Sequence, residues 1–189
     1  MTIYDKGLLR AMKQAYKDDG YYVAVTEGYI TIQTDDWGVR MYDQLVPNSI
    51  KSLIVLHNGC MPPRDSAVLC QKGECSSAFL DVVTGIMEDL VKDYTAGGGL
   101  AIKPTRLTFD GKRVWQLAEE LDVRLVDVDH QQIFQILFGE KVNAYLLGNT
   151  IFSHVPYGSL YIRTEIPEPE DKPLLQHLSG MQWIAVELG

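Results

Sequence analysis

Two distant stretches of the chain repeat the same order of patterns, a helical pattern followed by three short strand-like runs. In the first stretch, apolar side chains recur at helical spacing over residues 5–18, and Asp19 and Gly20 end the pattern. Turn-bounded strand-like runs then follow at 21–26, 29–34 and 39–42. The second stretch has a helical pattern at about 130–138 and runs at 142–147, 150–155 and 160–165. This order predicts two helix-plus-three-strand meander units.

Three pairs of turn residues support a relation between the two units. Gly28 and Gly148, Trp37 and Tyr157, and Gly38 and Gly158 are each separated by 120 residues. Each meander is also followed by an apolar run, at 53–57 and 183–186, which we interpret as a later strand. A pseudo-duplicated chain, with units at 5–57 and 123–189, explains these matches. Two unrelated meanders with the same turn chemistry explain them as well.

The segment between the units predicts mostly helix. Residues 58–76 form an irregular connection with a short strand at 67–70, and an apolar stripe predicts a helix over 77–95. A further helix is expected at 111–121, which gives a helical middle segment over 77–122, before a strand at 123–128. We therefore expect a single α+β domain over 1–189, with a mostly antiparallel sheet and two helices between the meander units.

In its order of elements, a strand–helix–three-strand unit used twice resembles the DNA sliding-clamp fold. The resemblance implies a DNA-associated accessory protein, and the basic first helix suits contacts with phosphates. The long stretch 58–122 departs from that order, and the chain contains no sequence motif of that family.

Four basic side chains of the first helix lie on one of its faces. Lys6, Arg10, Lys13 and Lys17 follow the spacing i, i+4, i+7 and i+11. The whole chain carries 17 basic and 25 acidic residues, a net charge of −8, which excludes a protein coated with basic charge. Residues 1–17 nevertheless hold four basic residues and one acidic one. The stripe predicts a local nucleic-acid contact, whereas the simpler interpretation is the solvated face of an amphipathic helix.

All three cysteines and one histidine fall within nineteen residues, as His57, Cys60, Cys70 and Cys75. Thiolate and imidazole are zinc ligands, and Gly59 and Gly73 supply the turns that such a site needs, so these residues are candidate zinc ligands. Buried cysteines that act as small apolar residues are the alternative. A third interpretation is a redox pair. Cys75, which precedes a predicted helix, is then the reactive thiolate, and Cys70 is the resolving cysteine that forms a disulfide with it.

Asp127 and Asp129 lie at the end of a predicted strand, on one face of it, where a hard cation such as Mg²⁺ could bind. The alternative is that Asp129 caps the following helix. The chain contains no phosphate-binding glycine loop, nucleophile elbow or H-E-x-x-H motif.

Taken together, the sequence favours a non-catalytic binding or interaction module with no firm cofactor requirement. The DNA-associated accessory protein and the zinc- or thiol-dependent protein remain as alternatives. Unpaired strands of the meanders also permit a homo-oligomer built through sheet edges. The start of the chain lacks a secretory pattern, and no apolar run approaches the roughly 18–20 residues of a membrane helix, so we expect a cytoplasmic protein.

Overall fold

The structure is a computed structural model that describes residues 5–118, 122–135 and 143–187. The first half contains α1 (Lys6–Lys17), β1 (Tyr21–Thr26), β2 (Tyr29–Gln33), β3 (Trp37–Tyr42), η1 (Asp43–Leu45), α2 (Asn48–Asn58), β4 (Ser66–Gln71), β5 (Glu74–Ala78) and α3 (Leu80–Thr95). The second half contains β6 (Leu100–Phe109), β7 (Lys112–Leu117), β8 (Val123–Asp127), α4 (Val128–Gln131), η2 (Gln132–Gln135), β9 (Ala144–Leu147), β10 (Thr150–Val155), β11 (Gly158–Arg163) and α5 (Lys172–Glu187).

Within the described residues, the strands form one 11-stranded sheet in the order β5-β4-β1-β2-β3-β11-β10-β9-β6-β7-β8. Every strand pairing in it is antiparallel. The two meanders, β1–β3 and β9–β11, join through the pairing of β3 with β11 at the middle of the sheet. The predicted α+β class with a mostly antiparallel sheet is therefore confirmed.

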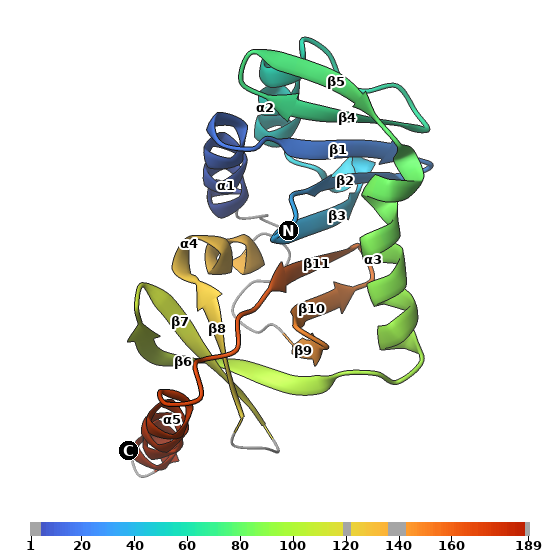
Figure 1. Cartoon of the computed structure of the whole chain (residues 1–189). Coiled ribbons are helices and arrows are strands. Elements are labelled where there is room, and N and C mark those ends of the chain that lie inside the picture. The colour runs from blue at the N-terminus through green and yellow to red at the C-terminus, as the bar shows by residue number, and fades with distance from the viewer. Residues whose placement is uncertain (1–4, 119–121, 136–142, 188–189) are drawn as a thin grey trace.

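Helices cover both faces of the sheet. Helices α1, α2 and α4 lie on one face, and α3 runs along the other face across strands of both meanders (Figure 1). On the first face, Leu8 and Met12 of α1 and Ile50 and Ile54 of α2 are buried in the largest hydrophobic cluster. On the second face, Met87 of α3 joins a smaller cluster with β10 and β11.

Three predicted elements have a different secondary structure. The run at 53–57, predicted as a strand, lies in α2, because Ile50, Leu53 and Ile54 are buried at helical spacing. The helix predicted at 111–121 is instead the strand β7 up to Leu117, and its residues 119–121 lie outside the described residues. Four consecutive residues of β7 are buried because both faces of the strand are covered. The run at 183–186, predicted as a strand, lies in α5.

The predicted helical middle segment over 77–122 is accordingly wrong. Its described residues contain one helix, α3, followed by the two strands β6 and β7. The short strand predicted at 67–70 is confirmed as part of β4, whose partner β5 was not predicted. The helix predicted at about 130–138 begins earlier, as α4 and then η2, and its residues 136–138 lie outside the described residues.

The two meanders match at an offset of 121 residues rather than 120. Strand β3 begins at Trp37 and β11 at Gly158, and the turn-closing pair Thr26–Tyr29 corresponds to Leu147–Thr150. A shift of one residue places a side chain on the opposite face of a strand. The residue pairs that match at offset 120, such as Gly38 and Gly158, therefore do not lie at equivalent strand positions.

Candidate functional site

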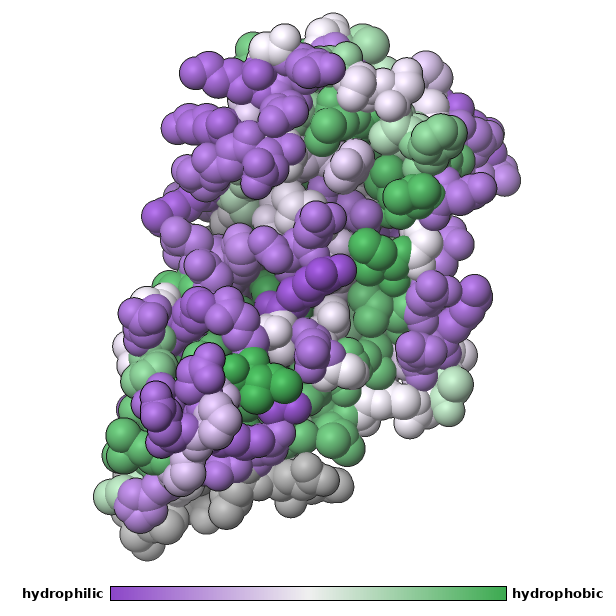
Figure 2. Space-filling model, viewed as in Figure 1, coloured by the Kyte–Doolittle hydropathy of each residue, from purple (hydrophilic) through white to green (hydrophobic). Residues whose placement is uncertain are grey.

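The four basic residues of α1 lie on its solvent side. Lys6, Arg10, Lys13 and Lys17 are all exposed, whereas Leu8 and Met12 on the opposite side of the helix are buried. The four side chains, with Leu9 and Gln14, line a shallow hollow of about 400 Å³. We call Lys6, Arg10, Lys13 and Lys17 the α1 basic face. The surface over α1 is hydrophilic, as Figure 2 shows at its upper left.

Three of these four cations make no ion pair within the part of the chain that the structure describes. Arg10 is the exception, since its guanidinium lies 3.2 Å from a carboxylate oxygen of Asp129 in α4. Lys13 lies near enough to His57 to affect its ionisation. Burial lowers the pKa of His57, and the positive charge of Lys13 lowers it further. Lys6, Lys13 and Lys17 are therefore available to an external anion.

Packing fixes α1 in place at both ends. Near its start, Gly7 lies so close to η2 that a Cβ at this position would be 2.3 Å from the Gln132 carbonyl oxygen. Near its end, the Tyr16 ring stacks on the His57 ring of α2 with centroids 3.7 Å apart. The Tyr16 carbonyl also accepts a hydrogen bond from the backbone N–H of Lys72. The basic face is thus presented on a helix held by three other segments.

An acidic cleft adjoins the α1 basic face. This cleft of about 620 Å³ shares Arg10 and Gln14 with the basic hollow. Five aspartates line it: Asp18, Asp19, Asp35, Asp36 and Asp129. They come from the end of α1, the β2–β3 turn and α4, so no local sequence pattern could have predicted the cluster. The cleft confines any favourable contact with phosphates to the basic side of the helix.

The predicted zinc ligands His57, Cys60, Cys70 and Cys75 are not brought together as a metal site. Among the described residues, which include all four, no group of three or more His, Cys, Asp or Glu side chains is placed to hold a metal ion. The Nδ1 atom of His57 lies 2.9 Å from the Tyr21 hydroxyl, and the Cys75 thiol donates to the His57 carbonyl at 3.1 Å. His57 therefore contributes to packing and hydrogen bonding between α1, β1 and α2.

The carboxylates of Asp127 and Asp129 have separate roles. Asp127, and not Asp129 as the sequence suggested, caps α4 by accepting a hydrogen bond of 2.7 Å from the Asp129 backbone N–H. The Asp129 side chain is the one paired with Arg10.

None of the helices that the structure describes is long and apolar enough to cross a lipid bilayer.

No protein-family model matches the chain, and no curated protein sequence matches it. Solved structures give a weak likeness. The beta subunit from the DNA polymerase of Streptococcus pyogenes has a TM-score of 0.37 and 10% identity, over 86% of this chain and 63% of that one. The DNA polymerase III beta subunit of Thermotoga maritima has a TM-score of 0.37 and 12% identity, over 87% and 64%. The chain thus spans less than two thirds of either structure's length, and scores this low support no inference about function.

Proposed function

We propose that this chain is a non-catalytic, DNA-associated accessory protein that contacts phosphates of duplex DNA through the α1 basic face. The observation that carries the proposal is the gathering of four exposed basic side chains around one hollow, on a helix rigidly packed against the sheet. A helix that is already held in place loses little backbone freedom when it binds a polyanion.

The dimensions of the face suit a short stretch of DNA backbone. Lys6 and Lys17 are eleven residues apart in one helix, a rise of about 16 Å. At 3.4 Å for each phosphate of one strand, this length corresponds to about five nucleotides. Three or four simultaneous phosphate contacts are therefore geometrically reasonable, and they carry no sequence preference by themselves.

The distribution of charge supports a local contact. Although the chain as a whole is acidic, the interaction of charges at physiological ionic strength decays over about 8 Å, so nearby charges dominate. The face holds three lysines without ion-pair partners among the described residues, and the aspartates lie beside the face in the adjoining cleft, where Asp129 pairs with Arg10. We expect weak affinity at physiological salt and measurable binding at low salt.

Fluorescence anisotropy with a labelled 20-base-pair duplex at low salt tests the proposal directly. We expect the triple change Lys6→Glu, Lys13→Glu and Lys17→Glu to abolish binding, and Lys13→Glu alone to weaken it about tenfold, from one lost phosphate contact and one added repulsion. Lys92→Glu is the matched control, because Lys92 is also an exposed lysine but lies on α3, on the other face of the sheet. Binding by the triple variant equal to that of the original chain would contradict the proposal.

A further inference from the structure

Two of the three cysteines, Cys70 and Cys75, face each other, and the third, Cys60, is exposed and lies apart from them. Cys70 of β4 and Cys75 of β5 are direct partners across the antiparallel hairpin that forms one edge of the sheet. The hairpin turn has two residues, Lys72 and Gly73, and the pair Gln71–Glu74 closes it. None of the three thiols forms a disulfide in this structure.

The hairpin register places the two thiols at a site that a disulfide can bridge. In a two-residue hairpin the closing pair, Gln71 and Glu74, is hydrogen-bonded, so the next pair along the ladder is a non-hydrogen-bonded one. In such pairs the Cα atoms are only about 4.5 Å apart and the side chains leave the same face of the sheet. Cα separations of about 4.4–6.8 Å are those of ordinary disulfides. The backbone therefore does not need to move for Cys70 and Cys75 to join.

We propose that Cys70 and Cys75 are a redox-active thiol pair, which a low-molecular-weight disulfide converts to a cross-strand disulfide. The two cysteines differ in access, and this difference sets the order of events. Cys75 is exposed, whereas Cys70 is fully buried. Cys75 therefore reacts first with the small disulfide. Cys70 reacts afterwards, and only with the sulfur atom of the neighbouring Cys75.

The reaction balances in two exchange steps. The Cys75 sulfur attacks the small disulfide RSSR, forms a mixed disulfide with one half and releases the other half, which takes the Cys75 proton and leaves as RSH. The Cys70 sulfur then attacks the Cys75 sulfur of the mixed disulfide and releases the second half, again as RSH. Two protein thiols are oxidised, and one small disulfide is reduced to two thiols.

The residues around Cys70 and Cys75 affect the reactivity of both thiols. Burial and, to a smaller extent, the nearby Cys75 raise the pKa of the Cys70 thiol to about 11, although a hydrogen bond with Tyr21 opposes this rise. Cys70 is consequently a poor nucleophile toward a freely diffusing reagent, and the second step depends on its closeness to Cys75. Because the Cys75 thiol donates to the His57 carbonyl, oxidation also removes one hydrogen bond at the end of α2.

The test is treatment of the native full-length chain with oxidised glutathione, followed by alkylation of the remaining thiols, digestion with trypsin and mass spectrometry. Trypsin places the three cysteines on separate peptides, 52–64, 65–72 and 73–92. We expect peptide 65–72 linked to peptide 73–92 as the main product, and a fall from three alkylatable thiols to one.

Two single variants separate the steps. Cys70→Ser should retain glutathione on Cys75, since no second thiol displaces it. Cys75→Ser should leave Cys70 unmodified in the folded chain. Lasting glutathione on Cys75 of the original chain, a bridge that involves Cys60, or three unmodified thiols would each overturn the proposal. These outcomes are independent of DNA binding.

Discussion

Gly38 of β3 and Tyr161 of β11 are direct partners in the strand pairing that joins the two meanders. A Cβ on Gly38 would lie 2.3 Å from Cε1 of the Tyr161 ring. The ring itself is fully buried, packs near Met87 of α3, and donates its hydroxyl hydrogen bond to the Thr34 carbonyl at 3.0 Å. The junction between the two halves of the sheet therefore depends on the absence of a side chain at position 38.

Gly38→Ala should lower the free energy of unfolding by about 1–3 kcal/mol, because the buried ring cannot move aside without loss of packing. Urea denaturation measures this change. In a Tyr161→Leu background, where the ring is absent, the same substitution should cost much less. An equal loss of stability in both backgrounds would show that contact with the Tyr161 ring is not the cause of the destabilisation by Gly38→Ala.

Gly7 and Gly85 provide a matched pair of helical glycines. Alanine at either position gains about 0.5–1 kcal/mol of helix propensity. At Gly85 of α3 a Cβ meets no atom within 4 Å, so Gly85→Ala should stabilise the protein by about that amount. At Gly7 the Cβ would press on the backbone carbonyl of Gln132, so Gly7→Ala should destabilise the chain by about 1–3 kcal/mol. Changes of the same sign in both variants would contradict the packing of α1 on η2.

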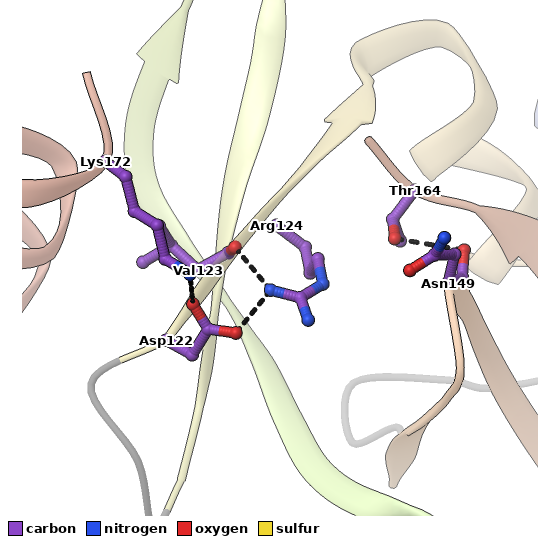
Figure 3. Close-up of polar contacts among 6 residues, drawn as sticks. All are labelled: Asp122, Val123, Arg124, Asn149, Thr164 and Lys172. Carbon is purple, nitrogen blue, oxygen red and sulfur yellow. Dashed lines mark hydrogen bonds and ion pairs between the residues drawn. The ribbon is translucent and has the colours of Figure 1, made fainter. Parts of the chain in front are cut away.

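Asp122 should make stability depend on acid pH. Its carboxylate lies between Lys172 of α5 and Arg124 of β8, at 2.7 and 2.5 Å (Figure 3). Burial by itself raises the pKa of Asp122, but hydrogen bonds from Lys172 and Arg124 outweigh it and hold the pKa below its ordinary value. A lowered pKa of an acid stabilises the fold above the pKa of the unfolded chain, and this contribution is lost as the pH falls through the lower, folded-state pKa.

Asp122→Asn should accordingly cost about 1–3 kcal/mol at pH 7 and flatten the loss of stability below about pH 4, as followed by urea denaturation at several pH values. Asp89→Asn is the control, because the Asp89–Lys92 pair is about three quarters exposed on both sides and contributes little. A pH profile of Asp122→Asn that parallels the original profile would refute the assignment.

The pKa of His57 should depend on the charge at Lys13 of the α1 basic face. Burial and Lys13 both lower its pKa, so it should titrate below about pH 6.5 in an NMR experiment. Since the unfolded chain takes up this proton first, stability should also begin to fall as the pH decreases below that value. Lys13→Glu should raise the pKa of His57, and Lys92→Glu should leave it unchanged. An unaltered titration in Lys13→Glu would mean that Lys13 does not approach the ring.

The sequence predicted those elements whose patterns are local. Helix α1 has a basic face opposite an apolar one, and the meander strands alternate between marked turns, so both kinds of element were predictable. Helix α2 was not, because the contiguous run Leu53–Leu56 is equally typical of a buried strand. The strand β7 was missed because Val114 and Leu117 have helical spacing, whereas tertiary packing buries every residue from Val114 to Leu117.

The surroundings of the candidate site could be predicted only in part. The four basic residues of α1 form one face, as their spacing predicts. The acidic cleft and the stacking of Tyr16 on His57 join segments that are distant in the chain, and no local pattern encodes them. The facing of Cys70 and Cys75 depends on the register of a hairpin whose second strand, β5, lacks strong strand-forming residues.

The salt dependence of duplex binding tests the central claim most directly. Each phosphate contact contributes about 0.9 to the slope of log K against log salt concentration, so three or four contacts predict a slope of about −2.7 to −3.6 for the original chain. Loss of one contact in Lys13→Glu should reduce the magnitude of the slope by about 0.9, and Lys92→Glu should leave the slope unchanged. A slope near zero, or one that is the same in Lys13→Glu and the original chain, would contradict the assignment of α1 as the phosphate-binding surface.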